Sequence, residues 1–245
     1  MRKVILWLCL LCLLLGGCVP QKAQPKHYTA TFLTLFDTVT TIVGPAASEE
    51  EFQLTAQKIH DDLERYHQLF DIYKDYEGVV NLKAVNDSAG IAPVKVDPEI
   101  LQLLTDCKTY YELTEGKVNV MLGSVLSLWH EARNDGIRDP MNAKLPDLEA
   151  LAAAREHTDM DSLILDEENS TVYLSDPLSS LDVGAVAKGW ACQRAADGKS
   201  HTLTGNGTLQ KHRFSVQRFL LNMDHAHSYG SWNGNFKIVF HYVYV

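Results

Sequence analysis

Residues 180–190 read Ser-Leu-Asp-Val-Gly-Ala-Val-Ala-Lys-Gly-Trp, and this order predicts a strand that passes through a tight turn into a helix. Gly184 suits the turn, and the free backbone amides at a helix start favour an anion such as a phosphate. Asp182 stands beside the turn, where it is placed to accept a hydrogen bond from a ligand, and Lys188 follows one helical turn later. An aspartate that caps a helix and a lysine exposed to solvent would account for the same residues, so this stretch alone does not decide between a phosphate site and an ordinary helix start.

Two amphipathic helices are predicted upstream of this stretch. The first begins after Ser48, a capping residue that three glutamates follow. The second begins at Asp97, with a proline in the first turn, and ends at Gly116. A polar loop is expected between them, over residues 73–92. The apolar face of the first helix consists of Phe52, Ala56, Ile59, Leu63, Tyr66 and Phe70.

The remaining segments predict a mixture of helices and strands. Residues 31–43 are rich in β-branched and aromatic residues and predict a strand, interrupted by Asp37, which is either an edge-strand charge or part of a site. Because helices and strands do not alternate regularly, the fold class is expected to be α+β, a mixed sheet packed with helices. Further helices are predicted over residues 122–134 and 148–157, a hairpin over 162–166 and 171–174, and a final strand over 236–245.

The N-terminus resembles a bacterial lipoprotein signal. Two basic residues precede an apolar run over residues 4–15, which is too short to span a membrane comfortably. Small residues directly before Cys18 resemble a lipobox, which predicts a signal peptide over residues 1–17, lipid on Cys18 and a tether over residues 18–28. The alternative is that this N-terminal segment is not cleaved and itself anchors the protein, which predicts the same location. We expect a protein that is lipid-anchored at the cell membrane and faces outside the cytoplasm.

Charge and cysteine content exclude several classes of protein. The formal charge is −9; four basic residues against one acidic residue give residues 201–245 a charge of +3, so the remainder carries −12. An acidic body argues against nucleic acid as a partner. In the predicted folded part only Cys107 and Cys192 remain, which do not make a disulfide framework, and no cysteine and histidine cluster has zinc spacing.

The stretch Leu-Asp-Val-Gly-Ala-Val-Ala-Lys-Gly-Trp closely resembles the signature of the FAD:protein FMN transferases, the ApbE family of thiamine biosynthesis lipoproteins. The resemblance covers residues 31–196. Trp129 is interpreted as a core residue. The other segments that agree in order and spacing are Phe36-Asp37-Thr38, Phe70 to Tyr73 with Asn81 to Asp87, and Gly116 to Val120 running into Leu128-Trp129.

The resemblance implies an enzyme that binds FAD, splits its pyrophosphate with the help of Mg²⁺, and hands the FMN half to a threonine of an acceptor as a phosphoester. Such phosphoryl transfer depends mainly on metal and positioning. The implied acceptors are flavoprotein subunits of membrane redox complexes. The backbone carbonyl of Ala185 is the implied magnesium ligand. The implied FAD contacts are Phe36, Tyr73, Lys117, Asn119, Asp182 and Lys188.

The family pattern fades after about residue 200. Residues 29–199 are interpreted as an incomplete FAD-binding transferase core and residues 200–245 as a non-matching tail. A Gly-Gly-Asn turn and a metal-binding Asp/Thr segment do not follow Trp190, so our hypothesis is a truncated or frameshifted gene that lacks the C-terminal part of the fold. A sheet without its later strands would keep an unpaired edge, and FMN transfer would be impaired. The alternative function is a non-catalytic, lipid-anchored flavin-binding lipoprotein.

Overall fold

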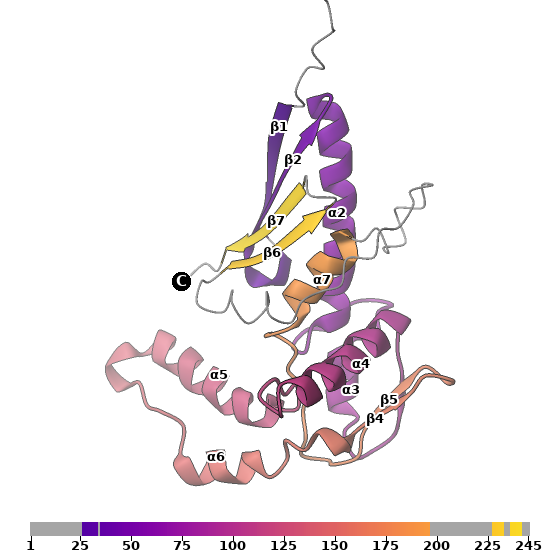
Figure 1. The fold of residues 1–245 in the computed structure, drawn as a ribbon. Helices are drawn as coiled ribbons and strands as arrows, with labels where there is room; N and C mark the ends of the chain where they lie inside the picture. Colours follow the sequence, from indigo (N-terminus) through magenta and orange to yellow (C-terminus); the bar gives the residue numbers. More distant parts are fainter. Residues whose placement is uncertain (1–25, 34, 197–226, 233–235, 242–245) are drawn as a thin grey trace, which may run out of the picture.

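The protein is an α+β fold with two small antiparallel sheets and several helices around them (Figure 1). The computed structural model describes residues 26–33, 35–196, 227–232 and 236–241. The predicted signal peptide, Cys18 and most of the tether lie outside these residues. Within the described part of the chain, no helix is both long and apolar enough to cross a membrane.

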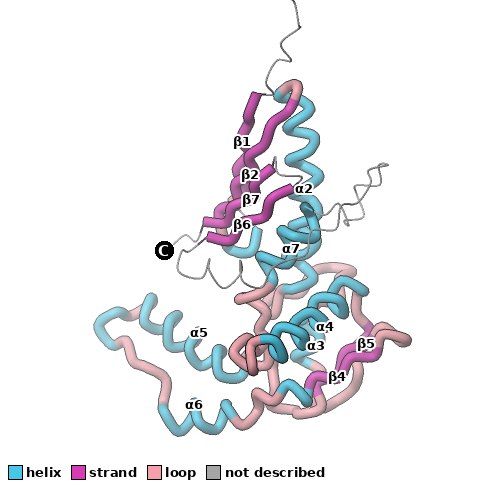
Figure 2. Tube along the Cα trace, viewed as in Figure 1, coloured by secondary structure: helices cyan, strands magenta, loops and turns pink. Residues whose placement is uncertain are grey.

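The larger sheet has the strand order β1-β2-β7-β6 (Figure 2). Its strands are β1 (Lys26–Phe32), β2 (Val39–Ala46), β6 (His227–Trp232) and β7 (Phe236–His241). The prediction of one interrupted strand over residues 31–43 is wrong. The 3-10 turn η1 (Leu35–Asp37) reverses the chain there, so β1 and β2 form a hairpin.

The strand predicted near the end of the chain is confirmed as β7, which pairs with β2 from Val39↔His241 to Val43↔Lys237. β6 was not predicted from the sequence, because Gly230 and two serines interrupt its aromatic residues and weaken the local strand signal. Its pairing with β7 supplies the context that makes it a strand.

Helix α2 (Glu49–Phe70) runs along this sheet, as Figure 1 shows. The Ser48 side chain accepts a hydrogen bond from the Glu51 amide at 3.2 Å, which confirms the predicted cap. Every residue of the predicted apolar face is buried. In β2, Thr40 and Ile42 are fully buried, so helix and sheet enclose the main core.

The second sheet lies with α3 (Leu82–Asp87) and α4 (Pro98–Leu113) near the C-terminal end of α2 (Figure 1). The polar loop expected over residues 73–92 contains the six-residue helix α3, which is too short to show a helical period. α4 and the β4–β5 hairpin are confirmed. The sheet has the order β3-β5-β4, with β3 (Val94–Lys95), β4 (Leu163–Asp166) and β5 (Thr171–Leu174).

Helices α5 (Gly123–Arg138) and α6 (Leu148–Arg155) project from the body of the molecule and are joined by a segment that contains η2 (Pro140–Asn142) (Figure 1). Only Gly123 of α5, and no residue of α6, is buried. Another short turn, η3 (Met160–Ser162), leads into β4. The last helix of the body, α7 (Ala187–Ala196), follows the 180–190 motif and packs against α2.

Candidate functional site

The site is built around the turn that leads into α7. The Asp182 amide donates to the Val120 carbonyl at 2.8 Å, and an isolated parallel bridge joins Ser180 to Leu122. The strand predicted at the start of residues 180–190 is therefore not a full strand, and it forms only these isolated backbone hydrogen bonds. The Gly184 amide donates to Asp182 Oδ1 at 2.8 Å, so Asp182 stabilises the turn through its side chain. The predicted helix begins at Ala187 and is confirmed.

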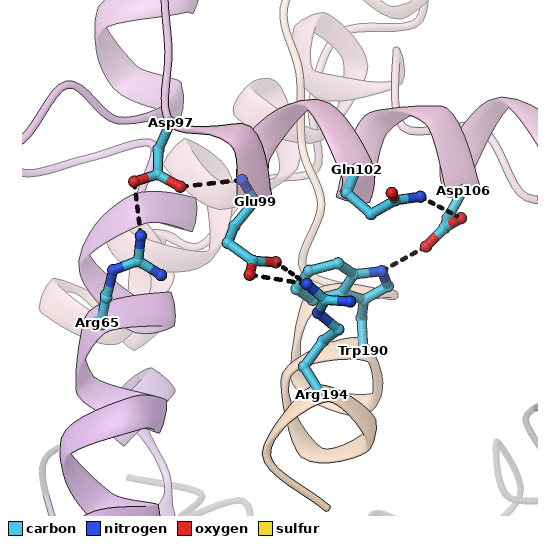
Figure 3. A network of polar contacts seen from close by, with 7 residues as sticks. All are labelled: Arg65, Asp97, Glu99, Gln102, Asp106, Trp190 and Arg194. Atoms are coloured by element: carbon cyan, nitrogen blue, oxygen red, sulfur yellow. Dashed lines mark hydrogen bonds and ion pairs between the residues drawn. The ribbon is translucent and has the colours of Figure 1, made fainter. Parts of the chain in front are cut away.

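Polar contacts hold α7 against α4 (Figure 3). The indole Nε1 of Trp190 donates to Asp106 Oδ2 at 2.7 Å. One turn further on, Arg194 Nη2 lies 2.8 and 2.7 Å from the two carboxylate oxygens of Glu99. Asp106 and Glu99 are seven residues apart on α4, and their partners are four apart on α7, so the two contacts fix both the position and the rotation of α7.

The η1 turn brings a second segment to the site. Phe36 and Asp37 have φ angles of 53° and 52°, in the left-handed region that non-glycine residues rarely adopt. Such conformations persist where the surroundings enforce them, and they gather at functional sites. Here Leu35 is 1% exposed, and Thr38 is buried with its hydroxyl donating to the Leu35 carbonyl. The Phe36 ring meets His67 of α2 edge-on, at 5.5 Å between centroids.

Lys188 connects the two segments electrostatically. Burial lowers the pKa of Lys188, and the nearby carboxylates of Asp37 and Asp182 partly offset this shift. A half-buried ammonium with two acids nearby is a charged arrangement that an ordinary helix start does not need. Asp37 and Asp182 thus lie near enough to Lys188 to act on its charge, and Asp37 lies in the η1 turn rather than on a strand edge.

A third segment, residues 71–76, carries Tyr73. Asp71 Oδ1 accepts from the Tyr73 amide at 2.7 Å and from the Lys74 amide at 3.1 Å, and Asp71 Oδ2 accepts from the Tyr76 hydroxyl at 2.7 Å. Partial burial raises the pKa of Tyr73 to about 12, and Asp182 adds to the shift. Tyr73 is therefore close to the motif turn, and it stays protonated at neutral pH.

The other implied flavin contacts lie in the loop after α4. The Asn119 amide donates to the Thr158 carbonyl at 2.9 Å, while its oxygen accepts from the Met121 amide at 2.8 Å. The neighbouring Val120 carbonyl meets the Asp182 amide, so Asn119 lies beside the turn with its side chain shaping the loop. Lys117 is exposed in the same loop, and no described contact brings it to Asp182 or Lys188.

Several residues of this region were not predicted as site residues from the sequence. Asp71 and Tyr76 organise the loop, and His67 lies between Phe36 and Tyr76. Asp71 stands inside a segment that matches the family, which was a usable signal. His130 follows Trp129 on α5 and binds Tyr73, and nothing in the local pattern points to that contact. Trp129 is 43% exposed, so its interpretation as a core residue is wrong, because α5 projects from the body.

The described residues near the turn do not form a ready-made cage for a metal. One group of three possible ligand side chains occurs in the described ranges, His60, Asp61 and Glu64 on the surface of α2. His60 also packs against Phe32 of β1. Magnesium commonly takes only one or two carboxylates and completes its shell with water and substrate phosphates. Asp37, Asp182 and the exposed Ala185 backbone fit that donor chemistry.

The fold is shared with flavin transferases of known structure. The ApbE protein from Thermotoga maritima is 26% identical, with a TM-score of 0.58 over 70% of this chain and 52% of that chain. The flavin transferase ApbE from Vibrio cholerae, at 22% identity, shows the same fold with a TM-score of 0.57 over 71% of this chain and 53% of that one.

The chain belongs to the ApbE family, whose model matches residues 34–204. Curated relatives named FAD:protein FMN transferase include one from Klebsiella pneumoniae, 25% identical over 74% of this chain and 51% of its own length. Another, from Treponema pallidum, is 27% identical over 76% of this chain and 50% of its own length. The chain thus spans about half the length of the curated relatives it matches.

Proposed function

We propose that the protein binds FAD and transfers its FMN half to a threonine of an acceptor protein, with magnesium as the metal. The observation that carries the proposal is the electrostatic interaction of Lys188 on α7 with Asp37 of the η1 turn and Asp182 of the motif turn. Membership of a family whose curated relatives are named FAD:protein FMN transferase supports the same reaction.

In this reaction the acceptor hydroxyl attacks the FMN phosphorus, a phosphoester bond forms, the pyrophosphate bond breaks and AMP leaves. In this proposal Lys188 contacts a phosphate oxygen, where its charge counters the negative charge that develops there. Asp182 holds the turn through the Gly184 amide and orients the start of the helix. Phe36 and Tyr73 offer aromatic rings to the flavin, although only Tyr73 is largely exposed.

Magnesium would be held by the Ala185 carbonyl together with Asp37 or Asp182 and the pyrophosphate oxygens. When bound, the ion supplies charge neutralisation to the pyrophosphate. Two carboxylates beside a single lysine leave the site poor in positive charge, so an anionic dinucleotide binds more favourably with a divalent cation. We propose that FAD binding is magnesium-dependent for this reason.

The lipobox resemblance supports a location at the outer side of the cell membrane, with lipid on Cys18. The acceptor is then a flavoprotein subunit of a membrane redox complex that exposes its threonine on the same side. A lipid anchor would keep enzyme and acceptor at one surface, which raises their effective concentration for each other.

The test uses the full-length chain in detergent, with FAD, Mg²⁺ and a purified flavin-acceptor domain. Covalent flavin fluorescence on the acceptor after denaturing electrophoresis is the expected result, in the reduced amount that impaired transfer predicts, and it should disappear with a chelator or in Lys188→Gln. An acceptor threonine replaced by alanine is the matched control. FAD binding without transfer would contradict the proposed reaction and favour the alternative of a non-catalytic flavin-binding lipoprotein.

A further inference from the structure

His130 is a residue of α5 that forms a hydrogen bond with the site. Its Nδ1 lies 2.6 Å from the Tyr73 hydroxyl, and the two ring centroids are 5.9 Å apart with a tilt of 54°. Fifty-seven residues separate the two in sequence, so the bond links α5 to the 71–76 loop. Since α5 buries only Gly123, this hydrogen bond is a specific cross-connection rather than a by-product of core packing.

The geometry fixes Tyr73 at two points. Its backbone amide is held by Asp71, and its hydroxyl, at the far end of the side chain, is held by His130. The side chain is 59% exposed, and an exposed tyrosine without a partner at its tip would sample several rotamers. With the Tyr73 hydroxyl as the donor, Nδ1 is the acceptor and a ring hydrogen lies on Nε2; in the other tautomer Nδ1–H donates to the hydroxyl oxygen.

We propose that His130 is a positioning residue for the flavin substrate, acting through its hydrogen bond to the Tyr73 hydroxyl. This inference rests on the proposed function, in which Tyr73 contacts FAD. Holding the ring before the ligand arrives removes part of the ordering cost of binding, the usual benefit of a preorganised contact. His130 itself does not contact the flavin in this account.

The test is a double-mutant cycle on the full-length chain, with FAD affinity measured by flavin fluorescence in the presence of Mg²⁺. Tyr73→Phe keeps the ring and removes the hydroxyl, and His130→Ala removes the acceptor. Each single variant should weaken FAD binding by about three- to tenfold, the effect of one hydrogen bond, and the double variant should be no worse than either. Both side chains lie at the surface, so the variants are expected to fold.

Two further variants sharpen the result. His130→Asn keeps an acceptor close to the position of Nδ1 and should restore affinity to within about twofold. His27→Ala, which removes an exposed histidine of β1, should leave FAD binding unchanged. These readouts separate positioning from a general loss of structure, which the asparagine variant would not rescue.

The outcomes that overturn the inference are distinct from those that overturn the proposed function. If wild-type protein binds FAD but His130→Ala binds equally well, or if the two single effects multiply in the double variant, His130 does not act through Tyr73. If wild-type protein does not bind FAD at all, the proposed function and this inference both fail.

Discussion

The Trp190 indole donates a hydrogen bond to the Asp106 carboxylate at 2.7 Å, and this contact joins the helix that follows the motif to α4. Lys188 stands two residues before Trp190, which places it on the opposite side of α7. A helix fixed on its Trp190 side therefore presents Lys188 towards Asp37 and Asp182. The contact between α7 and α4 therefore also sets the position of the Lys188 charge at the site.

Asp106→Ala should lower the free energy of unfolding by about 1–3 kcal/mol, because it leaves the buried indole N–H without its acceptor. Asp106→Asn keeps an acceptor and should cost less than about 1 kcal/mol. Urea unfolding followed by tryptophan fluorescence measures both. Equal losses in the two variants would show that charge, and not the hydrogen bond, matters at this position.

The Glu99–Arg194 pair is the most buried ion pair of the described residues, with side-chain exposures of 8% and 21%. Glu99→Gln should destabilise the protein by about 3 kcal/mol, because Arg194 would remain buried without a countercharge. The double replacement Glu99→Met with Arg194→Met should recover most of that loss.

The control for this pair is Arg65→Met, which breaks the more exposed contact with Asp97 and should cost about 1 kcal/mol or less. Denaturant midpoints at constant slope report all three effects. A double variant that is as unstable as Glu99→Gln would contradict this account of the pair.

Asp37→Asn separates the charge of the η1 turn from its conformation. Asparagine tolerates left-handed φ angles, so the free energy of unfolding should change by less than about 0.5 kcal/mol. The gain in FAD affinity on adding Mg²⁺ should fall by about tenfold, because a carboxylate near the pyrophosphate is lost. Titrations of FAD with and without the metal give the comparison, and an unchanged magnesium effect would remove Asp37 from the site.

Stability should also depend on pH through His67. Burial lowers the pKa of His67, an effect that Asp71 and Asp37 oppose only in part. The folded state thus favours neutral histidine, and stability is lost as pH falls below its ordinary pKa of about 6.5. His67→Gln should reduce the loss of unfolding free energy between about pH 7 and about pH 5, measured in urea. His27→Gln, on the exposed part of β1, is the control and should leave that pH dependence as in wild type.

The sequence predicted those parts of the fold that are set by local periodicity and capping. α2 follows directly from the Ser48 cap and a repeating apolar face. The hairpin turn at Phe36 was hidden, because phenylalanine rarely adopts a left-handed conformation and the flanking β-branched residues predict a continuous strand. α3 and β6 depend on their neighbours in space, which a single sequence does not display.

The residues of the candidate site also fall into those that a local pattern identifies and those that only the packing of distant segments brings together. Asp182 and Lys188 stand in one motif and could be identified from it. The approach of Asp37 to Lys188, and of His130 to Tyr73, depends on how distant segments pack. The sequence therefore identifies Asp182 and Lys188, whereas the contacts between distant segments are seen only in the folded structure.

The measurement that tests the central claim most directly is an FAD titration of wild-type protein and Lys188→Gln in the presence of Mg²⁺. We expect saturable binding by wild type and a loss of about tenfold or more in the variant, because a charge-assisted contact to phosphate is removed. Lys95→Gln, which changes an exposed lysine of β3, should bind as wild type does. Equal FAD affinity in wild type and a folded Lys188→Gln variant would contradict a flavin site at the start of α7.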